Sequence, residues 1–387
     1  MKFTIGLCKP GERIYDICMK SDQNLKNALT KVYQKKKHFK GVCFPTSISV
    51  NEVCGNFSPN AEDTTTLQEG DVAKIDLGVH INGFSSVIAH TVVCSSSNAP
   101  VTGKKADVIL AAYNAVQNAV RSMYIKPENT NNSVTNNTRT ICDSYKVSPV
   151  EGVLSHRMRR DIIDGPEVII NCTTFDQKVE QRAFAHGDVF GIDVMVSTGE
   201  GKPREAEVKC NVYKRAIENT YKLKTESGRK LLAVVEQNFH TFPFSLNSFD
   251  NESELQMKQK IDNFKTTAKM GLVECLKNEL LHPYPIMTER KGEIVAQFKY
   301  TVAVRNEGPL IISGVPLDLT QFQSELNIED AAIVERLKVN NDEFLPSSKK
   351  SVKVEKKKDN KAKKQKKKEN KEKRKEELKK KMEAEQK

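Results

Sequence analysis

The sequence has 387 residues, with 62 Lys and Arg against 50 Asp and Glu, and a formal net charge of +12. This length can bury one large core or two smaller ones, and no apolar run is long enough to span a membrane. The nine scattered cysteines form no C-x-x-C pair. Such usage is typical of a reduced compartment and argues against a zinc ribbon or a disulfide framework.

The positive charge is concentrated at the C-terminal end of the chain. Residues 349–387 contain 20 Lys and Arg and 8 Asp and Glu, so their net charge is +12. The first 348 residues hold the other 42 basic and 42 acidic side chains and are neutral. The tail has almost no apolar residues with which to form a core. We therefore expect a globular domain over 1–348 and a disordered Lys-rich tail over 349–387.

The first half of the sequence predicts helices on either side of a hairpin. Apolar residues at helical spacing predict helices over 12–37 and 104–124. Between them, 41–58 is predicted as a strand and loop, and the residues around Asp76 as a hairpin that continues to Val93. The Asn- and Thr-rich stretch 129–137 is predicted as a loop that leads into another helix.

The second half predicts a similar alternation of strands and helices. A second hairpin is predicted around Asp193, followed by a strand within 203–225. Helices are predicted over 229–239 and 271–281, with a polar insertion at about 250–267. Residues 293–304 predict a long strand with Gln297, Lys299 and Thr301 on one face, and 314–340 closes the fold.

A short motif, G-D-V-x-x-I-D, occurs at residues 70–76 and again 117 residues later at 187–193. In each copy Gly-Asp predicts a turn and the residues after it a half-buried strand. Asp76 and Asp193 then lie opposite the apolar face of their strands. Two equivalent strands, each with one carboxylate, indicate two similar halves that face each other across a cleft. Two unrelated turn-and-strand units are the alternative.

The strand around Asp76 resembles the first metal-ligand strand of the methionine aminopeptidases. Their pita-bread fold packs two pseudo-symmetric αβ halves around a dinuclear metal site. A closer resemblance is to the non-catalytic branch of that superfamily, the proliferation-associated or ErbB-receptor-binding proteins, and it is carried by residues 44–51, 151–156, 196–202 and 292–301.

This resemblance covers about residues 5–320 and the position of the Lys-rich tail. It implies an α/β pita-bread domain with a central cleft. Family members have an extra N-terminal helical segment that this chain lacks, so we expect an N-terminally short domain. Either Met1 is not the true start or the chain is a short form.

The resemblance also implies which residues stand where an aminopeptidase holds two metal ions with four carboxylates and one histidine. Asp76 is present, and Asp193 is one methylene shorter than the usual glutamate. The other three positions hold Val87, which has no donor atom, His156, which is out of register, and Lys299. The histidine on the substrate side is replaced by Asn56, which cannot act as a base.

Lys299 weighs most heavily against a metal site. A charged ammonium has no lone pair to donate, and at about 4 Å it would repel each unit of metal charge by a few kcal/mol. We expect Lys299 to replace the metal and to pair with Asp76 or Asp193. The sequence thus predicts no catalytic residue, no metal and no cofactor. A mononuclear remnant that uses His156 with the two aspartates is the minor alternative.

The basic residues predict contacts with nucleic acid. In the tail, phosphates can be bound without sequence preference by Lys356, Lys357, Lys358, Lys361, Lys363, Lys364, Lys366, Lys367 and Lys368. The same run can be a nuclear address or only a solubilising segment. On the body the candidates are Lys209, Lys214, Arg215, Lys222 and Lys224. A third group, Arg157, Arg159 and Arg160, would by itself be an ordinary solvated face.

The related proteins bind ribosomes and structured RNA. The resemblance therefore implies a catalytically inactive adaptor for the ribosome, rRNA or other structured RNA, acting in ribosome biogenesis, translation and growth regulation with ribonucleoprotein and regulatory partners. It implies a monomer in the cytoplasm and in the nucleus or nucleolus, without membrane insertion. The alternatives are a metal-dependent aminopeptidase with an altered site and a protein–protein scaffold with no RNA role.

Overall fold

A nine-stranded sheet lies at the centre of the computed structural model, which describes residues 1–35, 38–97, 99–250, 255, 263–339 and 344. Its main strand order is β1-β3-β4-β15-β9-β7-β8, and each of the described pairings in it is antiparallel. The strands are β1 (Lys40–Val50), β3 (Val72–Ile81), β4 (Phe84–Val93), β15 (Val295–Arg305), β9 (Val189–Ser197), β7 (Leu154–Arg157) and β8 (Val168–Ile170). β16 (Gly308–Ser313) pairs with β15, and β6 (Ser148–Pro149) pairs with β9.

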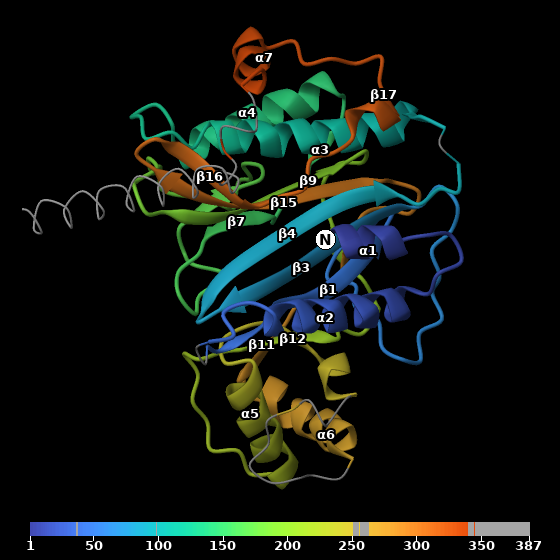
Figure 1. Cartoon of the computed structure of the whole chain (residues 1–387), viewed down its shortest axis with the longest axis vertical. Helices are drawn as coiled ribbons and strands as arrows, with labels where there is room; N and C mark the ends of the chain where they lie inside the picture. Colours follow the sequence, from blue (N-terminus) through green and yellow to red (C-terminus); the bar gives the residue numbers. More distant parts are fainter. Residues whose placement is uncertain (36–37, 98, 251–254, 256–262, 340–343, 345–387) are drawn as a thin grey trace, which may run out of the picture. The chain divides into compact units, whose positions relative to one another are not determined.

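Helices cover one face of this sheet (Figure 1). They are α1 (Lys2–Leu7) and α2 (Ile14–Thr30) beside the first strands, α3 (Gly103–Arg121) beside β15 and β9, and α4 (Asn131–Ser144) beside α3, β6 and β8. One row of side chains, Ile75, His90 and Phe298, runs across three strands on this face. Ile75 packs in the cluster with α1 and α2, and Phe298 contacts Tyr113 of α3 at 5.3 Å between ring centroids. Because side chains alternate along a strand, the next residues point to the opposite face.

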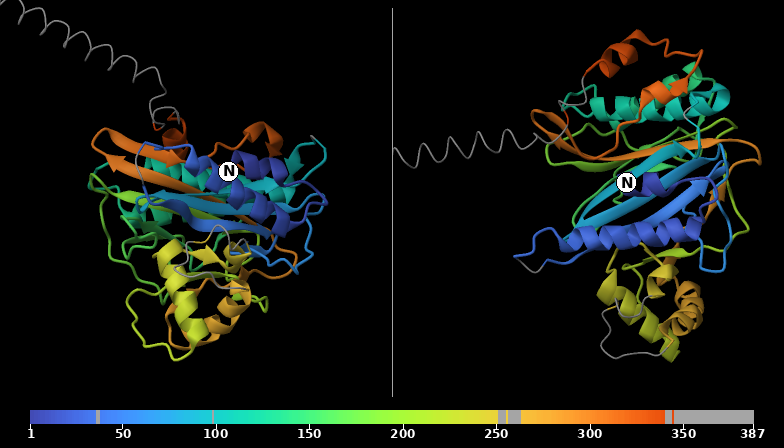
Figure 2. Two further views of the ribbon diagram at one scale, coloured as in Figure 1. Left: turned by 60° about the horizontal axis from the view of Figure 1, so that its bottom comes forward. Right: turned by 45° about the vertical axis from the view of Figure 1, so that its right-hand side comes forward.

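A smaller lobe lies apart from helices α1 to α4, at the bottom of Figure 1 and of both views of Figure 2. It contains α5 (Glu226–Asn238), α6 (Phe264–Lys277) and the strands β11 (Val212–Arg215), β12 (Phe244–Ser245) and β13 (Leu281–Pro283). Leu231, Val235, Phe244 and Phe264 form its core. The lobe therefore has an apolar centre of its own.

Short elements complete the described chain. β2 (Val53–Gly55), β10 (Arg204–Glu205) and β14 (Met287–Thr288) form a three-stranded sheet, and β5 (Val101–Thr102) pairs in parallel with β17 (Phe322–Gln323). Two 3₁₀ turns, η1 (Leu246–Phe249) and η3 (Leu319–Gln321), and a last helix, α7 (Ala331–Leu337), complete the set. In the part of the chain that the structure describes, no helix has the length and apolarity to cross a membrane. All nine cysteines are free.

Elements with strong local signals are confirmed. The hairpin β3–β4 turns at Asn82 and Gly83, whose φ angles of 52° and 84° are those of a type I′ turn. The long alternating strand is β15, and the amphipathic helices predicted over 104–124 and 229–239 are α3 and α5. The predicted insertion at 250–267 lies mostly, and the tail at 349–387 wholly, outside the described residues.

Several predicted boundaries are wrong. Helix α2 ends at Thr30 rather than near residue 37, because Tyr33 has φ of 48°, a left-handed conformation through which a right-handed helix cannot continue. Lys40 of β1 donates to the carbonyls of Leu29 and Val32 at this helix end. The predicted loop at 129–137 is largely the start of α4, where Thr130 accepts the Ser133 N–H and completes a capping box. Residues 203–225 form only β10 and β11, and α6 begins at Phe264 instead of residue 271.

The second predicted hairpin is also wrong. β9, which carries Asp193, pairs with β15 and β7, and neither strand is joined to it by a tight turn. The repeated motif nevertheless builds the same turn twice. Gly70 and Gly187 adopt φ of +81° and +87°, and the aspartate that follows each accepts the backbone N–H three residues back, Gln68 at 2.7 Å and Ala185 at 2.9 Å. The turns that lead into β3 and β9 are thus equivalent.

The buried histidine between the sheet and the helices predicts a loss of stability in acid. His90 is 4% exposed, its Nδ1 has no hydrogen-bond partner in the described structure, and burial lowers its pKa to about 4. In the unfolded state the pKa of His90 is near 6.5, so the unfolded chain takes up a proton first as pH falls. The contribution of neutral His90 to folding stability is therefore intact above pH 6.5 and is lost as pH falls toward 4. This group should destabilise the fold by about 2 kcal/mol between pH 7 and pH 5.

We expect His90→Phe, which keeps a ring at this position, to remove that part of the pH dependence. Urea unfolding of both proteins at pH 7 and pH 5 measures the difference. Equal losses of unfolding free energy in the two proteins would contradict a neutral buried imidazole.

Candidate functional site: the central cleft

Four side chains lie in one transverse row on the sheet face away from the helices. Asp76 of β3 stands opposite Ala89 of β4, Ala89 opposite Lys299 of β15, and Lys299 opposite Asp193 of β9. Partners in register point to the same side of a sheet. Because the methyl group of Ala89 is small, the Lys299 side chain can pass over β4 to reach Asp76.

The ammonium of Lys299 binds both aspartates. It contacts Asp76 Oδ2 and lies 3.0 Å from Asp193 Oδ2. Gln297 Nε2, two residues back on β15, donates a 2.8 Å hydrogen bond to Asp193 Oδ1. Asp76 Oδ1 is buried and has no hydrogen-bond partner within the described structure. The pairing with one aspartate or the other, expected from the sequence, is therefore a bridge between both.

Burial and charge act in opposite directions on this bridge. Burial raises the pKa of Asp76 to about 6, the charge of Lys299 opposes that rise, and the charge of Asp193 adds to it. Burial alone would lower the pKa of Lys299, but the charges of Asp193 and Asp76 outweigh it and raise the pKa. The ammonium thus remains charged at neutral pH, held between two carboxylates.

Apolar packing fills the position of the expected second metal ligand. Val87 is 5% exposed and clusters with Cys43, Met158 and Phe242. A Cβ on Gly78 would lie 2.9 Å from Val87 Cγ1 and 2.8 Å from Cys43 Sγ, so only glycine fits opposite Val87. A carboxylate could not replace Val87 here without entering this cluster.

His156 and Asn56 line the cleft but do not join the charged row. His156 of β7 stands opposite Gly191 of β9, and its Nδ1 bonds to the carbonyl oxygen of Gly165 at 2.9 Å. Asn56 donates to the carbonyl oxygen of Pro285 at 3.0 Å. Among the described residues, no group of three or more His, Cys, Asp or Glu is placed to hold a metal ion. With an ammonium between the aspartates and Val87 nearby, these residues do not fit the dinuclear metal centre of an aminopeptidase.

The cleft itself remains a cavity of about 410 Å³. Asp76, Lys299 and Asp193 line it together with apolar side chains from other elements, such as Phe44, Val150, Leu154, Met195 and Tyr284. The Lys299 Nζ lies 5.4 Å from the centroid of the Phe44 ring. The arrangement can hold a buried charge beside an apolar group.

The basic residues predicted on the body divide into two kinds. Lys209, Lys222 and Lys224 are exposed. Lys214 forms a 2.6 Å ion pair with Asp164 beside the cleft. Arg215 is 7% exposed, and its guanidinium contacts the carbonyls of Ala216, Leu280 and Asn219. Lys214 and Arg215 are therefore engaged within the fold, and the predicted tail lysines lie outside the described residues.

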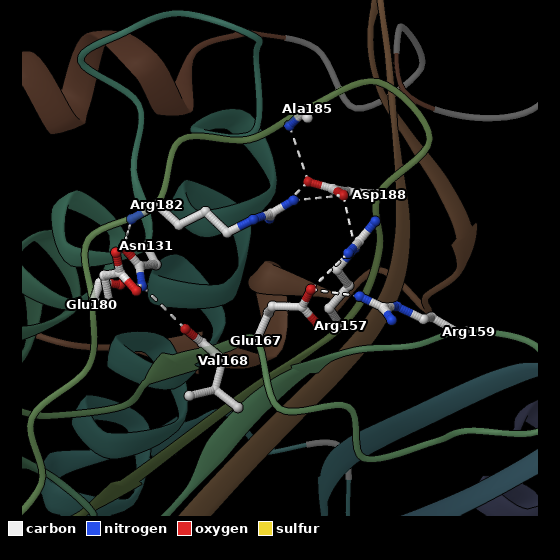
Figure 3. A network of polar contacts seen from close by, with 9 residues as sticks. All are labelled: Asn131, Arg157, Arg159, Glu167, Val168, Glu180, Arg182, Ala185 and Asp188. Carbon is white, nitrogen blue, oxygen red and sulfur yellow. Dashed lines mark hydrogen bonds and ion pairs between the residues drawn. The ribbon is translucent and has the colours of Figure 1, made fainter.

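Arg157 and Arg159 of the third group are engaged as well (Figure 3), and Arg160 donates to the carbonyl of Asn82 and lies 3.6 Å from Asp161. Arg157 Nε lies 2.7 Å from Asp188, and Arg157 and Arg159 both contact Glu167. Arg182 adds a second guanidinium to Asp188, whose side chain is 1% exposed. This network holds the second Gly-Asp turn. Sequence analysis missed Glu167 and Arg182, which lie 21 and 6 residues before Asp188 and form no local motif.

The fold and the paired aspartates of the cleft define a protein of the pita-bread class. A solved structure titled as a thermophilic Arx1 is similar, with a TM-score of 0.77 and 27% identity, covering 88% of this chain and 94% of that chain. Residues 2–224 match the sequence model of metallopeptidase family M24.

Two sequence relatives narrow the assignment. Proliferation-associated protein A of Dictyostelium discoideum is 38% identical over 335 residues, which cover 86% of this chain and 83% of that protein. The curved DNA-binding protein of Schizosaccharomyces pombe is 38% identical over 340 residues, with 86% and 84% covered. The chain belongs to metallopeptidase family M24 and, within it, to the proliferation-associated proteins.

Removal of the ammonium should destabilise the fold. Lys299→Met leaves two buried carboxylates without a cation, which should cost about 3–5 kcal/mol of unfolding free energy at pH 7. The cost should shrink as pH falls, because protonation of Asp76 removes one of the two charges, and without the charge of Lys299 the pKa of Asp76 is raised further. Asp76→Asn combined with Lys299→Met should recover part of the loss, as coupled partners do.

Urea unfolding of the single and double variants measures these differences, and Lys222→Met on the surface is the matched control. A loss below 1 kcal/mol for Lys299→Met, or no recovery in the double variant, would show that the bridge does not hold the two halves.

Proposed function

We propose that this chain is a non-catalytic member of its family that acts as a ribosome- and RNA-binding adaptor in ribosome biogenesis and translation. The observation that carries the first part is the Lys299 bridge between Asp76 and Asp193. The ammonium occupies the place between the carboxylates that two metal ions need, and it pairs with one oxygen of each carboxylate. The chain then requires no cofactor.

The second part is supported by charge and by the relatives. The tail presents nine clustered lysines between residues 356 and 368, and the body adds the exposed Lys209, Lys222 and Lys224. Such side chains bind phosphates by release of counterions. A relative of 38% identity is named a curved DNA-binding protein, which favours nucleic acid as a ligand. The proposed partners are the ribosome, rRNA or other structured RNA and ribonucleoprotein or regulatory proteins.

The proposal places a monomer in the cytoplasm and in the nucleus or nucleolus, where ribosomes are assembled and used. The basic tail serves there both as a phosphate-binding segment and as a nuclear address. A role in growth regulation is favoured by the name of the Dictyostelium relative, a proliferation-associated protein.

The absence of peptidase activity is tested by metal content and turnover. Protein purified without chelators and then incubated with Co²⁺ or Mn²⁺ should bind no stoichiometric pair of ions, because Lys299 opposes them. It should release no methionine from a Met-initiated peptide. Two bound equivalents with turnover would favour the altered aminopeptidase instead.

The RNA role is tested by co-sedimentation with ribosomes at two salt concentrations. The full chain should bind at low salt and lose affinity steeply as salt rises. A chain that ends at residue 348 should bind more weakly, with a slope of log K against log salt that is lower by several units. An equal unfolding midpoint in both chains is the control for folding. Binding that is absent, or insensitive to salt and to the tail, would favour a protein–protein scaffold with no RNA role.

A further inference from the structure

Four aromatic rings form a column that runs from the interior to the surface. Phe242 is fully buried and stacks on His80 at 4.3 Å between ring centroids. His80 lies 4.7 Å from Phe39, and Phe39 lies 4.2 Å from His240. His240 is exposed and ends the column. The column holds one aromatic ring at the surface, packed against Phe39 and exposed to solvent.

The backbone of His240 is unusual for a histidine. It follows the end of α5 with φ of +54°, and its N–H bonds to the carbonyl of Val235 at 3.1 Å. Glycine or asparagine normally occupies this left-handed position after a helix, and other residues incur about 1–2 kcal/mol of strain. The backbone conformation therefore does not explain why position 240 holds a histidine. Strain of this kind, held by the surrounding structure, is often associated with a functional site.

A groove of about 250 Å³ adjoins the outer end of the column. It is lined by His240, Thr241, Ile217, Arg215 and Glu236. Ile217 is 59% exposed, and Glu236 is an exposed acceptor whose Oε1 lies 3.3 Å from the buried Arg215 Nε. The groove thus combines a flat ring, an apolar contact and an exposed acceptor group, which are features that recognise an unpaired base.

A cation lies close to the same corner. Thr241 Oγ1 donates to the carbonyl of Asp161, and the neighbouring Arg160 is 65% exposed. Arg160 Nε donates to the carbonyl of Asn82, whose side chain accepts the N–H of Phe39 in the column. Arg160 Nε also lies 3.6 Å from Asp161 Oδ2. The guanidinium is therefore tied to the column through Asn82 and has further N–H groups to offer to a phosphate.

We propose that an unpaired base of single-stranded RNA stacks on the exposed face of His240 and extends the column by one ring. Ile217 contacts the base from the side, Glu236 accepts a hydrogen bond from its polar edge, and Arg160 contacts the backbone phosphate. The site rests on the proposed RNA binding and deepens it, because it adds base stacking on the body to the phosphate contacts of the tail.

The test uses the full chain and a ten-nucleotide single-stranded RNA with one central 2-aminopurine, whose emission falls when the base stacks. His240→Asn keeps a residue that tolerates the left-handed backbone and removes the ring, whereas His240→Phe keeps a ring. The wild type and His240→Phe should bind with quenching. His240→Asn should bind about tenfold more weakly, with quenching lost and the salt slope unchanged. His282→Asn, at an exposed histidine in the smaller lobe, is the matched control and should behave as the wild type.

A second pair of variants does not touch the column. Ile217→Glu places a charge in the groove, and Val273→Glu places one at a position that is 70% exposed on α6. Only Ile217→Glu should reduce binding and quenching. This pair remains informative if His240→Asn does not fold.

The outcomes separate the site from the proposed function. If the wild type binds RNA but His240→Asn or Ile217→Glu binds and quenches equally well, the stacking site is wrong and RNA binding stands. If His240→Phe loses binding as His240→Asn does, the ring is not a stacking platform and the site is also wrong. If the wild type binds no RNA at all, the proposed function fails and the stacking site fails with it.

Discussion

The structure depends on one buried cation that is shared between its two halves. Asp76 comes from the first half, Asp193 from the second, and Lys299 lies between them on β15. Each of these charges would be costly to bury alone, and an ion pair in the interior is tolerated only when its geometry and remaining hydrogen bonds are good. Gln297 supplies one such bond to Asp193. The bridge therefore makes each half of the cleft depend on the other.

The sheet separates this charge from the apolar core. One face of β3, β4 and β15 presents Ile75, His90 and Phe298 to the helices, and the next residues along present Asp76, Ala89 and Lys299 to the cleft. The two Gly-Asp turns set the start of β3 and β9 in the same way, but the second is also held by the arginines around Asp188. The two turns thus have the same conformation and the same position before their strands, but they differ in the side chains that surround them.

Sequence analysis succeeded where a pattern was local and periodic. The hairpin around Asp76, the helix α3 and the alternating strand β15 follow from spacing alone. It failed where residues far away in the sequence determine the structure. β9 pairs with β15 and has no hairpin partner, and Lys40 of β1 contacts the C-terminal end of α2. The Asn- and Thr-rich start of α4 has the composition of a loop, and only the capping box at Thr130 indicates a helix.

The same limit applied to the cleft. The repeated motif identified Asp76 and Asp193 and the family resemblance identified Lys299, but the bridge to both aspartates needed the register across four strands. Ala89 has no polar group that would mark it as a site residue, although its small side chain lets the Lys299 side chain cross β4.

The order of the strands along the chain has a further consequence. β4 ends at Val93, and its sheet neighbour β15 begins at Val295. The edge of β4 that pairs with β15 therefore stays unpaired while roughly 200 residues are synthesised, or for about 10–40 s at 5–20 residues per second. During translation that unpaired edge is a site for aggregation or chaperone binding, and the two halves can close only when the last strand of the main sheet order has left the ribosome.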